Sequence, residues 1–142
     1  MHRYLVIANR TLAGGHLVDK LLDLQRAGPC TFYVLVPATP PRDHNWTEAE
    51  ARMIANERLD GALARFRAAG LEAEGEVGDA HPTEAVGDLL RRGEAFDAIV
   101  LSTLPPGISK WLRLDLPHRM EALLELPVIH VTGHAEPQFR SA

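Results

Sequence analysis

Polar side chains that could hold a small ligand follow two apolar runs of the sequence. Asn9 comes directly after the run 4–8, and Ser102 and Thr103 come directly after the run 98–101. Carboxamide and hydroxyl groups can take part in hydrogen bonds as donors and as acceptors, so these residues could orient a polar ligand. No G-x-S-x-G sequence surrounds the hydroxyls, so we expect no nucleophilic catalysis and assign no catalytic residue.

Further ligand candidates lie in the stretch 103–114 and at the end of another apolar run. They are Val36, Gly107, Ser109, Lys110 and Arg113. The two cations could meet an anion, such as a phosphate or an acidic partner. The alternative, which we favour, is a solvated basic face that neutralises Asp115. Trp111 could be a lid or a partner contact, but packing of the loop against the core is the favoured interpretation.

The cysteine and histidines do not form a metal-binding pattern. The histidines stand at positions 2, 16, 44, 81, 118, 130 and 134 without a paired-ligand motif. His130 and His134 are four residues apart, but that spacing helps only on a helix, and a strand and a tail are predicted there. The single cysteine, Cys30, excludes an intramolecular disulfide and a cysteine cluster for zinc. We therefore expect scattered surface histidines and no metal site.

The size and composition of the chain indicate an ordinary globular protein. Its 142 residues suffice for one domain, 1–142, with 135–142 as a frayed tail. The net charge of −4 provides no basic footprint for nucleic acid. No apolar run approaches the length of a membrane span or fits a signal peptide. We expect a cytoplasmic protein that binds neither nucleic acid nor membrane.

Strands and helices alternate along the predicted chain. The predicted strands are 4–8, 31–36, 71–77, 98–101 and 127–132. Three are continuous apolar runs, as in buried parallel strands, whereas 71–77 alternates with glutamates, as in an edge strand. The pattern predicts an α/β fold with a five-stranded parallel sheet in the order 3-2-1-4-5 and helices on both faces. Strands one and four would then end at Asn9 and Ser102, the switch point where ligands bind in such sheets.

Three details of the helices can also be predicted. Thr47 and Glu50 form a capping-box pattern, and the helix behind them has Met53 on its apolar face. The stretch 103–114 contains prolines and glycine, which predict a long loop. A last helix then begins near Pro117, with Asp115 or Leu116 as its cap.

Four stretches resemble the universal stress protein family. They are the run YLVIA at 4–8, Gly78-Asp79 shortly before a proline, FDAIVLS at 96–102 and LPVIHV at 126–131. The resemblance covers nearly the whole chain and implies a fold like that of the adenine nucleotide alpha hydrolases. It also implies a homodimer through the last strand, from Pro127 to Thr132, a strand whose apolar edge needs cover.

The residues that bind nucleotide in the family differ in this chain. Nucleotide-binding members have an aspartate after the first strand, which corresponds to Asn9, and a Gly-x2-Gly-x9-Gly-[ST] motif. Laid without gaps between Asp97 and Pro127, the motif positions fall on Leu101, Leu104, Leu114 and Asp115. A leucine Cβ obstructs the approach of phosphate to the backbone. A carboxylate about 4 Å from a phosphate charge would add repulsion of about 4 kcal/mol at an effective dielectric near 20.

Two classes of function are compatible with these observations. The first is a non-catalytic, dimeric protein of the universal stress type, which acts in stress response through contacts with an unknown protein partner and needs no cofactor. The second is a protein that binds ATP or another adenine nucleotide, or a slow ATP hydrolase, with a variant phosphate loop.

Overall fold

The computed structural model describes residues 1–39, 45–105, 109–113 and 115–133. Its elements are, in chain order, β1 (His2–Ile7), α1 (Gly15–Ala27), β2 (Cys30–Pro37), α2 (Glu48–Ala68), β3 (Ala73–Gly78), α3 (Pro82–Arg91), β4 (Ala98–Thr103), α4 (Lys110–Arg113), α5 (Leu116–Leu124) and β5 (Val128–Thr132). The strands form one parallel sheet in the order β3-β2-β1-β4-β5. The predicted α/β fold and strand order are confirmed.

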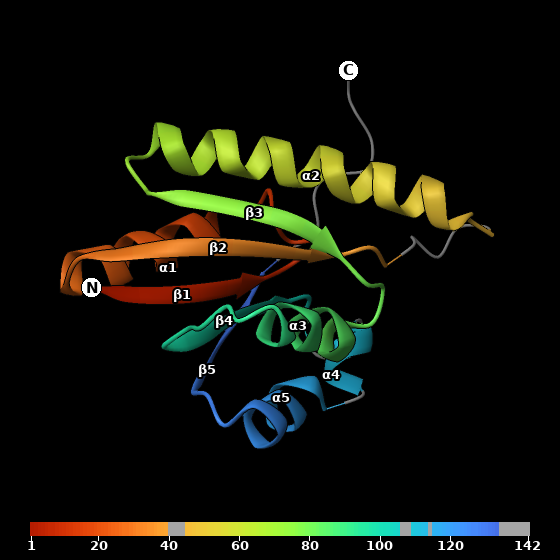
Figure 1. The fold of residues 1–142 in the computed structure, drawn as a ribbon. Coiled ribbons are helices and arrows are strands. Elements are labelled where there is room, and N and C mark those ends of the chain that lie inside the picture. Colours follow the sequence, from red (N-terminus) through yellow and green to blue (C-terminus); the bar gives the residue numbers. More distant parts are fainter. Residues whose placement is uncertain (40–44, 106–108, 114, 134–142) are drawn as a thin grey trace.

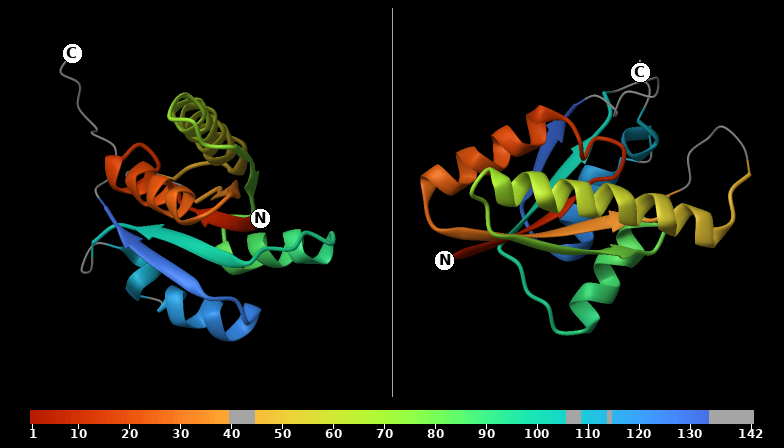
Figure 2. Two further views of the ribbon diagram at one scale, coloured as in Figure 1. Left: turned by 90° about the vertical axis from the view of Figure 1, so that its left-hand side faces the viewer. Right: turned by 90° about the horizontal axis from the view of Figure 1, so that it is seen from above.

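Helices cover both faces of the sheet. Figure 2 shows α1 and α2 on one face and α3, α4 and α5 on the other. Successive residues of β1 point to opposite faces, so Val6 joins the core under α1 and α2, whereas Leu5 and Ile7 join the core under α3 and α5. All three side chains are fully buried. This explains why the central strands are continuous apolar runs.

Helix α2 begins as the sequence predicts, but one of its side chains faces solvent. Thr47 Oγ1 accepts a hydrogen bond from Glu50 N at 3.1 Å, and Glu50 Oε1 accepts one from Thr47 N at 2.9 Å, which confirms the capping box. The prediction that Met53 faces the core is wrong, since this side chain is 61% exposed. The buried stripe of the helix runs through Ala51 and Ala55. Met53 is about 200° around the helix from Ala51 and lies opposite that stripe.

The segment between β4 and α5 is not entirely the predicted loop. The short helix α4 lies within it, and the hydroxyl of Ser109 accepts a hydrogen bond from Leu112 N at 3.1 Å, as a capping side chain does. Trp111 packs against the core under α3 and α5, in agreement with the favoured interpretation. The helix is only one turn long, too short for a periodic signal in the sequence.

Asp115 precedes α5 as predicted, but its side chain does not cap the helix. The residue has a left-handed backbone, with φ of 54°, and makes no side-chain cap hydrogen bond. Its carboxylate instead lies 3.4 Å from Nδ1 of His118. The backbone oxygen of Asp115 accepts the first helical bond, from Arg119 N at 3.1 Å.

Two further points concern the extent of the chain. The predicted frayed tail, 135–142, lies outside the described residues. In the ranges described above, no helix is both long enough and apolar enough to cross a membrane.

Candidate ligand site at the carboxyl ends of the strands

Buried polar side chains gather at the carboxyl end of the sheet. In the described part of the chain, the polar side chains that are buried are Asn9, Thr11, Ser102, Thr103 and Ser109, each at most 5% exposed. The first two follow β1, the next two end β4, and the last precedes α4. Strands β1 and β4 are neighbours in the sheet, so the four residues that follow β1 or end β4 lie at the switch point at which open α/β sheets bind ligands.

A hydroxyl and imidazole cluster joins the end of β4 to the segment after β1. Ser102 Oγ shares a hydrogen bond of 2.5 Å with Thr11 Oγ1 and one of 3.0 Å with His16 Nε2. Two glycines make room for the imidazole. A Cβ atom on Gly14 would lie 2.5 Å from His16 Nδ1, and one on Gly133 would overlap the ring. His16 is thus half-buried between backbone segments and is not one of the expected scattered surface histidines.

The carboxamide of Asn9 is bonded at both of its polar atoms. Its Nδ2 donates to the backbone oxygen of Pro37, at the end of β2, at 2.7 Å. Its Oδ1 accepts from Nη1 of Arg58, on α2, at 2.5 Å. Arg65, two turns further along α2, donates to the backbone oxygen of Leu12 at 3.2 Å. Helix α2 is therefore tied by two arginines to the segment between β1 and α1.

Thr103 connects β4 to the edge strand β5. Its Oγ1 donates to the backbone oxygen of Leu104 at 2.9 Å and lies 2.7 Å from His130 Nε2. Since a hydroxyl has one hydrogen, Nε2 of His130 is the donor in the second bond. His130 as a whole is exposed, but the partial burial of its ring lowers its pKa, because the charged imidazolium loses some hydration there.

The structure brings together only part of the predicted ligand set. Asn9, Ser102 and Thr103 lie at the switch point as expected. Val36 has a fully buried side chain in the core under α1 and α2, and Ser109 caps α4. Lys110 and Arg113 belong to α4, and Gly107 lies outside the described residues.

Three residues of the site were not predicted from the sequence, namely Thr11, His16 and Arg58. The first two lie in the segment after the first strand, and the rule that parallel strands end at one edge could have indicated them. Arg58 comes from a distant helix, although Arg58 and Arg65 are seven residues apart and so share one helical face.

The structure describes two of the three leucines that stand at glycine positions of the family's nucleotide-binding motif. Leu101 is fully buried inside β4, before the segment that follows the strand begins. Leu104 is the first residue after the strand, and Leu114 lies outside the described residues. Across the described ranges, no group of three or more His, Cys, Asp or Glu side chains is placed to hold a metal ion.

Three solved structures with a similar fold are universal stress proteins. The protein from Archaeoglobus fulgidus is 19% identical, with a TM-score of 0.59 over 92% of this chain and 93% of that one. A member of the family from Burkholderia pseudomallei is 15% identical, with a TM-score of 0.64 over 91% and 94%. The A. fulgidus protein in complex with dAMP is 17% identical, with a TM-score of 0.60 over 92% and 98%.

No protein-family model and no curated protein matches the sequence. The similarity to universal stress proteins is therefore shown by the fold, which extends over more than nine-tenths of the chain. This confirms at the level of structure the resemblance that the sequence stretches indicate.

Proposed function

We propose that this protein functions as a universal stress protein does in the broad sense, without catalysis, through protein contacts and with weak or no binding of ATP. The observation that carries the proposal is that the polar side chains at the switch point are already hydrogen-bonded to one another and to the backbone. Asn9 is bonded at Oδ1 and at Nδ2, and Ser102 is bonded to two side chains. A ligand would have to replace these bonds, and their loss offsets much of what new contacts contribute.

The segment after β4 supports the same proposal. Leu104 stands where a phosphate-binding loop would need the backbone to approach its ligand closely, and its Cβ obstructs that approach. Asp115, at the last motif position, has a largely exposed carboxylate beside His118. A negative side chain in that position repels a polyphosphate.

Binding of an adenine nucleotide, with or without slow hydrolysis of ATP, is the second candidate function. One observation favours it, namely that a universal stress protein with the same fold binds dAMP. The side chain of Asn9 also has a donor and an acceptor, the groups that contact with a base or a ribose requires, although both are bonded within the protein.

Calorimetric titration with ATP, ADP, AMP, dAMP and cyclic AMP separates the two candidates. We expect dissociation constants weaker than about 1 mM for all of them, with and without magnesium. Micromolar affinity for any of these ligands would contradict the proposal. Release of inorganic phosphate from ATP, measured in parallel, tests the hydrolase alternative directly, with the same protein after heat denaturation as the control.

The proposed working unit is a cytoplasmic homodimer that pairs through β5 and offers its remaining surface to a protein partner during stress response. What supports the pairing is the position of β5 at one edge of the sheet. Its apolar residues Val128, Ile129 and Val131 are only partly buried in the single chain. Unpaired apolar edges of this kind favour aggregation unless they are covered.

A further inference from the structure

Two hydrogen-bond acceptors at the ends of β1 and β2 are occupied by the protein itself. Asn9 Oδ1 accepts from Arg58 Nη1 at 2.5 Å, and the backbone oxygen of Pro37 accepts from Asn9 Nδ2 at 2.7 Å. Asn9 is 5% exposed and Pro37 is buried. A ligand that entered here with an amino group would find both acceptors already engaged by donors.

Arg58 is a strong competitor for the carboxamide oxygen. It is half-buried and donates a charge-assisted hydrogen bond, which is roughly twice as strong as one between neutral groups. It is also held by α2, so it forms this bond without the loss of translational and rotational freedom that a free ligand suffers. Arginine stays protonated over the pH range in which proteins fold, so a change of pH does not release the oxygen.

We propose that Arg58 is an occluding residue, whose guanidinium stands where the amino group of a small ligand would donate to Asn9. The excluded ligands are those that present an amino donor, such as 6-aminopurine nucleotides. This inference rests on the proposed function, because it gives a cause for the weak nucleotide binding that we propose at the switch point.

Arg65 provides a matched control for the test. It lies on the same face of α2, two turns from Arg58, and it also donates to the segment between β1 and α1. Its acceptor is the backbone oxygen of Leu12, not the carboxamide of Asn9. Removal of either arginine takes a cation from this region, but only removal of Arg58 takes the arginine donor from the Asn9 oxygen.

The experiment is calorimetric titration of wild type, Arg58→Ala, Arg58→Leu and Arg65→Ala with dAMP and with dIMP. The second nucleotide carries a carbonyl oxygen in place of the 6-amino group, so it has no donor at that position. Both Arg58 variants should bind dAMP about 10- to 100-fold more tightly than wild type, the range expected from freeing one charge-assisted hydrogen bond. Arg65→Ala should bind dAMP as wild type does, and no variant should gain affinity for dIMP.

The experiment distinguishes failure of this inference from failure of the proposed function. No gain in either Arg58 variant, an equal gain in Arg65→Ala, or an equal gain for dIMP would each overturn the inference. Adding Asn9→Leu to Arg58→Ala should abolish the gain, and its persistence would overturn the role of Asn9. Micromolar binding of dAMP by wild type would instead contradict the proposed function. Circular dichroism and thermal unfolding of every variant show whether the fold is retained.

Discussion

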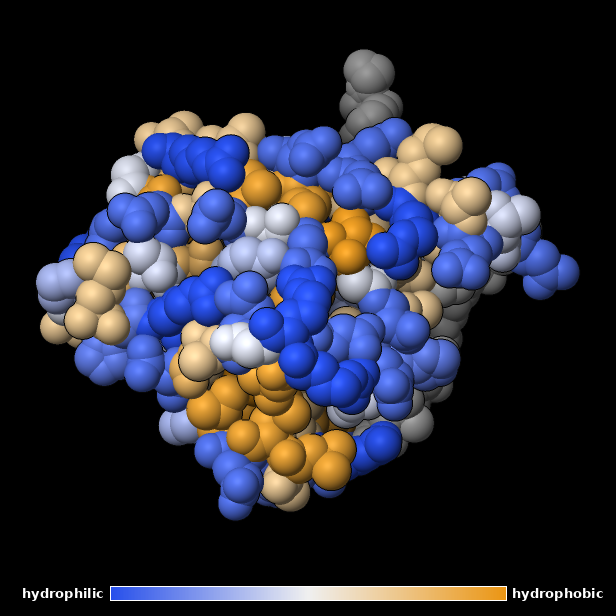
Figure 3. Space-filling view, in the orientation of Figure 1, coloured by the Kyte–Doolittle hydropathy of each residue, from blue (hydrophilic) through white to orange (hydrophobic). Residues whose placement is uncertain are grey.

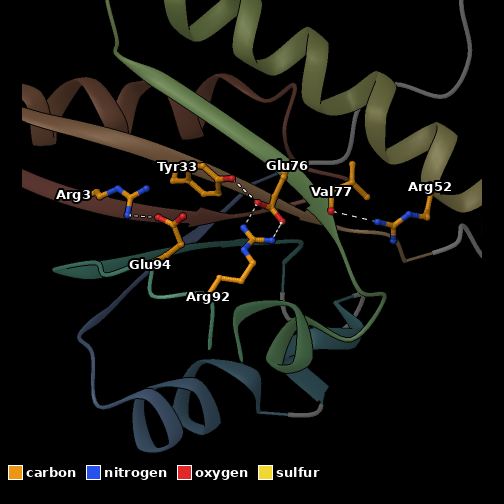
Figure 4. Close-up of polar contacts among 7 residues, drawn as sticks. All are labelled: Arg3, Tyr33, Arg52, Glu76, Val77, Arg92 and Glu94. Carbon is orange, nitrogen blue, oxygen red and sulfur yellow. Dashed lines mark hydrogen bonds and ion pairs between the residues drawn. The ribbon is translucent and has the colours of Figure 1, made fainter. Parts of the chain in front are cut away.

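At the scale of single residues, the sheet carries a polar cluster that is separate from the ligand site. Glu76 on β3 accepts a hydrogen bond from the hydroxyl of Tyr33 at 2.5 Å and contacts the guanidinium of Arg92 at 2.5 and 3.0 Å (Figure 4). Nearby, Arg3 pairs with Glu94 at 2.9 Å. The pKa of Tyr33 is raised to about 12, mainly by burial and secondly by the hydrogen bond to Glu76. The bond from Arg92 lowers the pKa of Glu76.

The first prediction concerns this cluster. In a titration followed by phenolate absorbance, Tyr33 should ionise near pH 12, above its ordinary value of 10.0. Glu76→Gln should lower that pKa without restoring 10.0, because burial persists. Tyr33→Phe assigns the signal, since the chain has two tyrosines. Ionisation of Tyr33 near pH 10 in wild type would contradict the assigned contacts.

The same shifts fix the sign of two stability effects. The folded pKa of Tyr33 is raised, so its contribution is complete below pH 10 and is lost as the pH rises towards 12. The folded pKa of Glu76 is lowered, so its contribution is present above the ordinary value of 4.5 and is lost as the pH falls through the folded pKa.

At the scale of elements, one glycine permits the close approach of β3 to its neighbours. Gly75 pairs with Val34 of β2. A Cβ atom on Gly75 would overlap the backbone oxygen of Val34 and would lie 2.9 Å from Leu59 Cδ1 on α2. The strand therefore fits between β2 and α2 only because this position has no side chain.

The second prediction compares the same substitution at two glycines. Gly75→Ala should destabilise the fold by about 1–3 kcal/mol, as overpacking of a core does. Gly87→Ala, inside α3, should stabilise by about 0.5–1 kcal/mol, since alanine favours helix. Its new Cβ would meet only the end of the Arg91 side chain, at 3.3 Å. Urea unfolding measures both, and a Gly75→Ala protein as stable as wild type would show that the strands can separate without cost.

The arrangement of the elements could be read from the sequence because burial dictates it. Strands covered on both faces must be continuously apolar, and strand-helix alternation allows few topologies. Two features could not be predicted from the sequence, namely the buried face at the start of α2 and the presence of α4. The first turns of α2, which begins at Glu48, bury Ala51 and Ala55, so the large apolar residue Met53 indicates the wrong face there. Helix α4 has only one turn, so it gives no periodic pattern in the sequence. The hydroxyl of Ser109 caps this turn.

The site was predictable only from its strands. Asn9 and Ser102 follow apolar runs, and their meeting is a consequence of topology. The place of His16 after the first strand could have indicated it, whereas the contact of Arg58 with Asn9 depends on a side-chain conformation that no spacing fixes. Asp115 is the N-cap residue, as predicted, but its side chain makes no cap hydrogen bond, because the left-handed backbone places the carboxylate beside His118.

At the scale of the whole molecule, polar and apolar surface are separated on one face. Figure 3 shows hydrophilic side chains across the middle of this face and a hydrophobic patch below, where Figure 1 draws α5. Leu123 of α5 is 65% exposed, and Leu126 and Val128 are partly exposed. Because α5 leads into β5, apolar surface continues to the edge strand, as expected of a surface that another chain covers.

The third prediction uses the hydrogen-bond pattern of the edge. Pro127 O accepts from Ile99 N at 2.9 Å and Gly133 N donates to Thr103 O at 3.0 Å, so odd-numbered residues of β5 face β4. The backbone of Val128, His130 and Thr132 therefore faces the edge. Thr132→Pro should remove one outward donor and turn the proposed dimer into a monomer, without breaking the ladder to β4. Thr132→Ala keeps the donor and should stay dimeric in light scattering.

The last prediction is a dependence of the dimer on pH. In an antiparallel pair across a two-fold axis, the middle residue of β5 lies near its own copy, so His130 would approach the partner's imidazole. Burial lowers the pKa of His130 below its ordinary 6.5, so the imidazole is neutral at pH 8. As the pH falls through that lowered value, two imidazoliums form and repel each other, and the dimer should loosen between pH 8 and about pH 5. His130→Asn, which cannot gain charge, should not respond. Light scattering that shows a monomer at every pH would reject the interface, whereas a dimer of constant strength would reject only the role of His130.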